Sequence, residues 1–155
     1  MNLRLDNPVG GPRRRLVPHP KPPQSLEETG LDPKFLGQLL LKTIYRLNLE
    51  RPSEISHSMK LPVQLVEQLI GDAVDKRLLE TKGQLGANLI AEMRYALTTL
   101  GRQWALEALQ QNEWVGPAPV PVEMFVRQAH RQSIRGEILT RDMLERQFVD
   151  LTLAD

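Results

Sequence analysis

The sequence predicts a mainly α-helical fold that contains one small β-hairpin. Two observations support this fold class. Apolar residues recur at three- and four-residue steps over residues 32–47 and 62–78, which is the period of a helix with one buried face. Between residues 78 and 97 the pattern changes to two short strand-like segments, and two glycines in residues 83–91 lie between them. Such an arrangement is typical of a hairpin.

The first long helix is expected to begin near Asp32. Pro33 would then occupy the first helical position, where a missing N–H leaves no hydrogen bond unmade. The predicted buried face consists of Phe35, Leu36, Leu39, Leu40, Ile44 and Leu47. The chain breaks at residues 50–52, and residues 53–59 predict a short helix in which Ile55 and Met59 lie four residues apart.

The next segment, together with the short helix before it, predicts a helix-turn-helix. Lys60 and Leu61 are expected to form a tight turn, and Pro62 to open a longer helix that ends near Leu78. The side chains expected to point inward from this helix are Val63, Val66, Leu69, Ile70, Ala73 and Val74.

The predicted hairpin completes a recognisable order of elements. Residues 78–82 and 92–97 predict its two strands, and Thr98 is the expected N-cap of a further helix. That helix carries Leu100, Trp104, Leu106 and Leu109. A helix, a helix-turn-helix, a hairpin and a last helix, in this order, predict a winged helix-turn-helix with the hairpin as the wing.

Proline content divides the rest of the chain. Residues 1–24 contain six prolines and two glycines, which favours an extended arm. The winged-helix domain is expected at residues 25–112, a proline-rich linker at 113–121 and a C-terminal helical extension at 122–155. Helices are expected in this last part at about 121–135 and 141–150.

The net charge of +1 is unevenly distributed. Residues 1–24 hold five basic and one acidic side chain, a charge of +4, whereas residues 113–155 hold five basic and seven acidic ones, a charge of −2. A field that attracts polyanions therefore lies mainly in the arm. The chain has no cysteine, which excludes a disulfide scaffold, a thiolate metal site and a cysteine nucleophile. Without an apolar run of about 18 residues or a secretory leader, the sequence predicts a cytoplasmic protein that does not enter a membrane.

The sequence contains no pattern of catalytic or metal-binding residues. His19, His57 and His130 each lack a partner at metal-ligand spacing and are expected to be surface residues. Neither a nucleophile elbow nor a glycine-rich phosphate loop occurs. These observations predict a protein that is not an enzyme and requires no cofactor.

Duplex DNA is one candidate partner, because a winged helix commonly lays its third helix in the major groove and its wing along the backbone. The residues that would make these contacts are Lys60, Gln64, Gln68, Lys82 and Arg94. The glutamines could hydrogen-bond adenine edges. However, Glu67, Asp72 and Asp75 on the same helix would repel phosphates, and the wing has only two cations.

Two clusters of basic residues are candidate sites for an anionic nucleotide, such as a cyclic dinucleotide. In the arm they are Arg13, Arg14, Arg15 and His19, and in the C-terminal extension they are Arg127, Arg131 and Arg135. Guanidinium groups bind phosphates through forked, charge-assisted hydrogen bonds. The alternative for the arm is a solvated basic tail. For the extension we expect the apolar side of its first helix to pack on the domain, with the arginines in solvent. We also expect Trp104 and Trp114 to be packing residues.

The segment YALTTLGRQWALEAL, with Tyr95, Leu97, Thr98 and Gly101, resembles the strand-to-helix junction of bacterial winged-helix proteins of the MarR and PadR type. A wider resemblance begins at Pro18. It covers LVPHPKPPQSLEETGL, the winged helix, WVGPAPVP and SIRGEILTRDMLERQFVDLTL, which are similar to the region before the ATPase core in certain bacterial AAA+ ATPases. No phosphate-binding loop of the form G-x-x-x-x-G-K-[ST] occurs in this sequence. The resemblance therefore implies a regulatory or recognition module and no ATPase activity.

Two hypotheses about function follow. In the first, the chain is a non-catalytic module that regulates or recruits through protein contacts and is gated by an anionic nucleotide at the arginine arm. In the second, it is a DNA-binding transcriptional regulator that uses the helix-turn-helix and the wing. A homodimer would favour the second hypothesis, and the apolar side chains of the wing would permit self-association.

Overall fold

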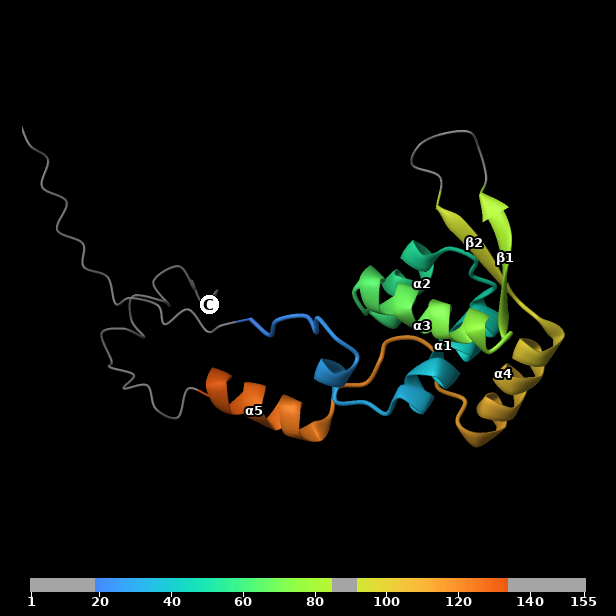
Figure 1. The fold of residues 1–155 in the computed structure, drawn as a ribbon. Helices are drawn as coiled ribbons and strands as arrows, with labels where there is room; N and C mark the ends of the chain where they lie inside the picture. Colours follow the sequence, from blue (N-terminus) through green and yellow to red (C-terminus); the bar gives the residue numbers. More distant parts are fainter. Residues whose placement is uncertain (1–18, 85–91, 134–155) are drawn as a thin grey trace, which may run out of the picture. The chain divides into compact units, whose positions relative to one another are not determined.

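In its described residues, the protein is a winged helix-turn-helix followed by one further helix (Figure 1). The computed structural model describes residues 19–84 and 92–133. A short 3-10 helix at Glu27–Thr29 precedes α1 (Pro33–Leu47), α2 (Pro52–Met59), α3 (Val63–Asp75), β1 (Leu79–Gln84), β2 (Met93–Leu97), α4 (Thr99–Gln111) and α5 (Val122–Gln132). Pro20–Phe125 form one compact unit. The predicted fold class is confirmed.

The helix starts follow the capping residues in the sequence. Asp32 is the N-cap of α1, its carboxylate accepts a hydrogen bond from the backbone N–H of Lys34 at 2.8 Å, and Pro33 is the first helical residue. Pro52 opens α2 in the same way. Lys60 then takes a left-handed conformation with φ of 55°, which turns the chain from α2 into α3. The expected helix-turn-helix is therefore present.

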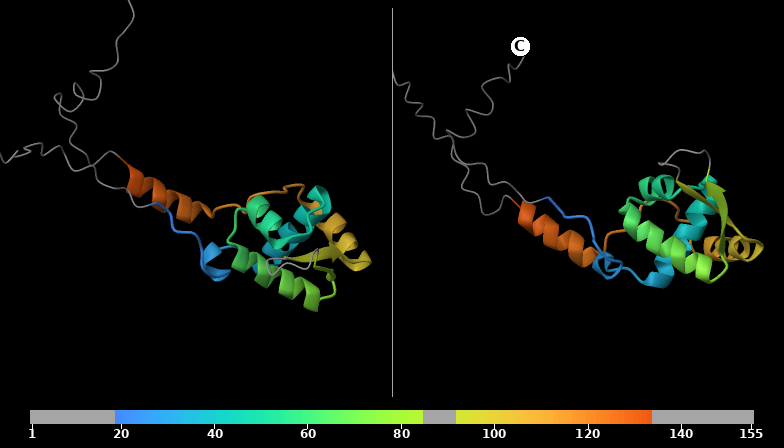
Figure 2. Two further views of the ribbon diagram at one scale, coloured as in Figure 1. Left: turned by 90° about the horizontal axis from the view of Figure 1, so that it is seen from above. Right: turned by 45° about the horizontal axis from the view of Figure 1, so that its top comes forward.

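The apolar core lies where the first three helices, α4 and the inner side of the hairpin meet. In this unit α4 packs against α1, and α2 packs against α3, an arrangement that Figure 2 shows from two further directions. The buried apolar side chains include Leu36, Leu39, Leu40, Ile44, Ile55, Met59, Val66, Leu69, Ile70, Leu78, Leu79, Leu97 and Ala105. Most of them are the residues that the helical periodicity predicts.

Some predicted boundaries and faces were wrong. Helix α3 ends at Asp75, not near Leu78, because Arg77 adopts a left-handed conformation with φ of 57° and redirects the chain into β1. Val63 and Leu47 are exposed, although the periodicity placed both inside. Val63 is the first residue of its helix and Leu47 the last of its own. Periodicity cannot tell where along a helix the packing partner ends.

The two strands form an irregular antiparallel hairpin. Thr81 pairs with Tyr95 and Gly83 with Arg94, so Lys82 is an extra residue without a partner on β2. Gly83 supports this β-bulge with a φ of 82°, a value that residues with a side chain rarely adopt. Bulges redirect side chains, and this one changes where Lys82 points. The wing residues Leu85, Leu89 and Ile90 lie outside the described residues.

The junction between the hairpin and α4 is closely packed. The Thr98 hydroxyl caps α4 by accepting a hydrogen bond from the backbone N–H of Gly101 at 3.0 Å, as the sequence predicted. The same hydroxyl donates to the carbonyl oxygen of Arg77 at 2.8 Å, and the Thr98 backbone N–H donates to the carbonyl oxygen of Leu78 at 3.1 Å. A Cβ at Gly101 would overlap this Leu78 carbonyl. The junction therefore requires glycine at position 101.

Residues 113–121, which we expected to be a linker, are bonded to the winged helix. The backbone N–H of Ala118 donates to the carbonyl oxygen of Met59 at 2.8 Å, and Ala118 packs against the core. The indole N–H of Trp114 donates to the carbonyl oxygen of Pro117 at 3.0 Å. However, Trp114 is 52% exposed and Trp104 on α4 is 46% exposed. The expectation that both tryptophans are packing residues is therefore wrong.

Lys42 on α1 is only 2% exposed, which the sequence did not predict. Its ammonium group donates to the carbonyl oxygen of Asn112, the C-cap of α4, at 2.9 Å. The partial negative charge at a helix C-terminus favours a cation there. Burial nevertheless removes water from the ammonium group and lowers the pKa of Lys42 from its ordinary value of 10.5.

The lowered pKa predicts how stability depends on alkaline pH. Between the folded and the ordinary pKa of Lys42, the unfolded chain binds more protons than the folded chain, so the free energy of unfolding rises with pH in that window. Lys42→Met removes this rise. The check is urea unfolding of both chains over the alkaline range, with Lys34→Met, an exposed lysine of the same helix, as the control. A rise that persists in Lys42→Met, or that Lys34→Met also removes, contradicts the assignment.

Candidate functional site

The exposed face of α3 is acidic. Its solvent-facing residues are Val63, Gln64, Glu67, Gln68, Gly71, Asp72 and Asp75, and no lysine or arginine occurs between Val63 and Asp75. The opposite side is fixed in the core through Leu65, Val66, Leu69 and Ile70. The two glutamines named as DNA contacts are therefore exposed one turn apart, and Lys60 is exposed just before the helix. The same face carries three carboxylates, which repel a phosphate backbone.

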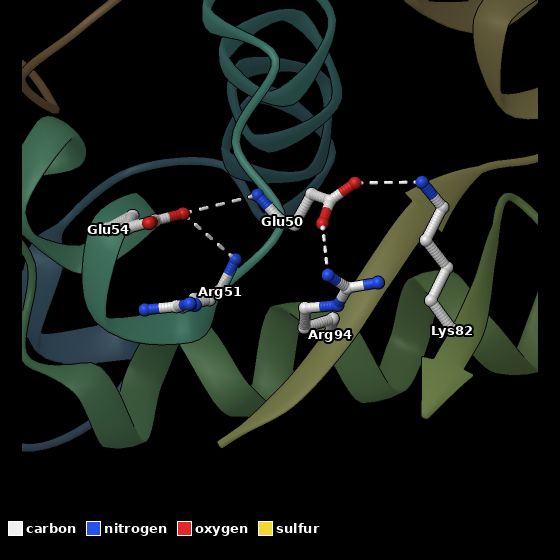
Figure 3. Close-up of polar contacts among 5 residues, drawn as sticks. All are labelled: Glu50, Arg51, Glu54, Lys82 and Arg94. Carbon is white, nitrogen blue, oxygen red and sulfur yellow. Dashed lines mark hydrogen bonds and ion pairs between the residues drawn. The ribbon is translucent and has the colours of Figure 1, made fainter. Parts of the chain in front are cut away.

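The two cations of the wing are both paired with one carboxylate, that of Glu50 (Figure 3). One oxygen of Glu50 lies 2.7 Å from the ammonium nitrogen of Lys82 on β1, and the other lies 3.5 Å from a guanidinium nitrogen of Arg94 on β2. Lys82 and Arg94 are the wing residues that the sequence assigned to DNA contact. Neither of them is an unopposed positive charge.

Glu50 is held in place by its backbone as well as by its side chain. It lies in the segment between α1 and α2, and its carbonyl oxygen accepts a hydrogen bond from the backbone N–H of Tyr95 on β2 at 2.8 Å. The hydrogen bond from Lys82 lowers the pKa of Glu50. Partial burial opposes this shift, while the charges of Lys82, Arg94 and Arg51 add to it. Glu50 therefore remains ionised and joins the α1–α2 segment to both strands of the wing.

Two further carboxylates lie at the N-terminus of α2. Glu54 accepts hydrogen bonds from the backbone N–H groups of Arg51 at 3.3 Å and Glu50 at 3.4 Å (Figure 3). Glu92, next to β2, accepts from the backbone N–H of Ser53 at 2.7 Å and from its hydroxyl at 2.7 Å. The backbone N–H groups of Glu50, Arg51 and Ser53, which would favour an anion, thus donate to carboxylates of the chain itself.

The structure describes three of the candidate nucleotide-binding residues. Arg127 and Arg131 are exposed on α5, and His19 is also exposed. The remaining residues of this set lie outside the described part of the chain: Arg13, Arg14, Arg15 and Arg135. Also outside it is the helix expected at residues 141–150.

The apolar side of α5 is exposed. Val122 is 70% and Phe125 is 67% exposed, and Val126 and Ala129 on the same side are exposed too. Packing of this side on the domain stays a prediction. The helix retains the one-sided apolar pattern of a packing helix, so this pattern does not identify what it packs against.

Sequence reasoning missed Glu50, Glu92 and Lys42. A signal for Glu50 does exist, because Lys82 and Arg94 belong to strands that pair and two cations brought together favour a nearby carboxylate. Nothing in the local sequence shows which carboxylate this is. In residues 19–84 and 92–133, no three histidine, aspartate or glutamate side chains gather in a way that could hold a metal ion. In this part of the chain, every helix is too short or too polar to cross a membrane.

Comparison with known proteins shows no family for this chain. The chain matches no protein-family model and no curated protein. It is similar to the crystal structure of a protein from Pseudomonas aeruginosa described as a transcriptional regulator, with 19% identity, 81% of this chain and 76% of that chain covered, and a TM-score of 0.43. It is also similar to the organohalide-sensing transcriptional regulator RdhR in its 2,4-dichlorophenol-bound form, with 15% identity, coverage of 76% and 61%, and a TM-score of 0.44.

Proposed function

We propose that this chain is a non-catalytic winged-helix module that recognises a protein partner through the exposed face of α3 and the adjoining wing. The observation that carries the proposal is the charge of these two elements. Helix α3 presents three carboxylates and no cation, and both wing cations are paired with Glu50. Phosphate contacts by lysine and arginine supply most of the general affinity for nucleic acid, and this surface offers few of them.

An anionic nucleotide is proposed as the ligand that gates this module. Its site would be formed by Arg13, Arg14 and Arg15, since three adjacent guanidinium groups in a segment of charge +4 suit a phosphate dianion. The resemblance to the region before the ATPase core of bacterial AAA+ ATPases supports a module that acts together with an ATPase, by regulating it or by recruiting a partner to it.

The direct test places a photo-cross-linking residue at exposed Gln68 of α3 and, as a control, at exposed Arg102 of α4. We expect Gln68 to cross-link to one protein in cells, the control position to miss that protein, and Glu67→Lys to abolish the cross-link. In parallel, the purified chain is titrated with labelled random duplex DNA. A saturable affinity for duplex DNA that falls steeply with salt, together with cross-links to DNA alone, would refute the proposal.

DNA binding is the second candidate function, and one observation favours it. Gln64 and Gln68 are exposed in the N-terminal half of α3, the part of a recognition helix that contacts base edges, and Lys60 is exposed in the turn just before it. If this candidate holds, Gln64→Ala and Gln68→Ala should relax the sequence preference for adenine, with each substitution costing about 1–3 kcal/mol of discrimination. Selection of preferred sites from a random duplex library measures this directly.

A further inference from the structure

The geometry points to a backbone-phosphate site on the wing, formed by Lys82 and Arg94, which Glu50 fills from within the chain. Glu50 is then a selectivity residue that keeps nucleic acid off the wing. This inference rests on the proposed function, and names one residue that adds to the preference for protein over nucleic acid. Its ligand class is the phosphodiester monoanion of a nucleic-acid backbone.

The first support is the way the carboxylate spans both strands. Its two oxygens lie 2.7 Å from Lys82 on β1 and 3.5 Å from Arg94 on β2. A phosphodiester group also presents two charged oxygens to neighbouring cations, so the same two side chains suit it. Glu50 comes from a different segment of the chain and enters between them (Figure 3).

The second support is that the wing geometry aims both cations at one place. Lys82 is the extra residue of the β-bulge, and Gly83 adopts the positive φ that this bulge requires. Without the bulge the register of every later residue of β1 would shift by one. The bulge thus sets where the Lys82 ammonium group lies relative to Arg94.

The third support is that the guanidinium group of Arg94 is not fully hydrogen-bonded. Its Nε–H is buried and has no hydrogen-bond partner, and its contact with Glu50 is the longer of the two. The buried Nε–H cannot reach a ligand, so the guanidinium nitrogen that Glu50 approaches at 3.5 Å is the one that a phosphate would contact. Lys82 and Arg94 remain partly exposed, so a ligand can reach them when Glu50 no longer competes.

The test is Glu50→Gln in the full chain, measured by fluorescence anisotropy with labelled random duplex DNA at several salt concentrations. The amide keeps the side-chain shape and an oxygen acceptor for Lys82, but not the charge. We expect duplex affinity to appear or to rise about tenfold at low salt. The slope of log affinity against log salt should steepen by about 0.9 for each phosphate newly neutralised. Unchanged thermal unfolding and amide spectra outside the wing verify that the variant is folded.

The matched control is Glu80→Gln, which removes an exposed carboxylate of the same hairpin that belongs to neither ion pair. The double variant Glu50→Gln with Lys82→Gln should lose the gained affinity. Equal gains in Glu50→Gln and Glu80→Gln, no gain at all, or a gain that survives removal of Lys82 would each overturn the inference while leaving the proposed function intact. Strong duplex binding by the unaltered chain would instead overturn the proposed function.

Discussion

Gly101→Ala is expected to destabilise the winged helix by about 1–3 kcal/mol, because the added methyl group pushes the backbone of α4 away from the backbone at Leu78. Gly101 lies in the first turn of α4, directly against the Leu78 carbonyl at the end of the α3–β1 turn. That carbonyl also accepts the backbone N–H of Thr98, so it cannot move without loss of a hydrogen bond. Chemical denaturation monitored by circular dichroism measures the change in unfolding free energy.

The same substitution at Gly71 is the matched control. Gly71 lies inside α3 on its exposed side, and nothing lies within 4 Å of where its Cβ would be. Gly71→Ala should therefore stabilise the protein by up to about 1 kcal/mol, through the better helix propensity of alanine. If the two variants have the same stability, the close approach at Gly101 does not restrain the fold.

Converting the three carboxylates of α3 to amides is expected to give the chain a measurable affinity for duplex DNA. The variant is Glu67→Gln with Asp72→Asn and Asp75→Asn, which are the exposed acidic residues of the helix. Each like charge near 4 Å from a phosphate costs about 1 kcal/mol in water, so three such contacts correspond to a gain on the order of a hundredfold at low salt. Anisotropy titration with random duplex DNA gives the affinity and its salt dependence.

A control of equal net charge distinguishes the helix face from the charge of the whole protein. Glu107→Gln with Glu113→Gln and Glu123→Gln also adds three units of positive charge, at exposed positions outside α3. This control should gain far less affinity than the α3 variant. If both gain equally, the acidic face of α3 does not set the preference, and long-range attraction explains the result.

Local rules were sufficient where neighbouring residues decide the structure. Asp32 with Pro33 predicts where α1 begins and Thr98 predicts where α4 begins, and both starts are confirmed by the capping hydrogen bonds. The apolar periods of α1 and α3 predict most of the core. These features depend on contacts within four residues, which a single sequence displays.

Features that depend on distant partners could not be predicted. Lysine is usually a surface residue. The burial of Lys42 depends on the carbonyl oxygen of Asn112 at the end of α4, seventy residues away along the chain. Glu50 meets Lys82 and Arg94 only because the bulge and the α1–α2 segment bring them together. The apolar side of α5 has the spacing of a packing face, but amphipathic spacing does not identify the partner.

The hydrogen bond between Ala118 and Met59 has a consequence for stoichiometry. Met59 ends α2 immediately before the turn into α3, and only four residue steps separate Ala118 from Val122, the first residue of α5. An extended chain covers at most about 14 Å in four steps, so the first turn of α5 stays within roughly one domain radius of the helix-turn-helix corner. A folded domain seated at the start of α3 therefore occupies the space around the start of α5. Two large partners, one at the start of α3 and one at the start of α5, would therefore exclude one another.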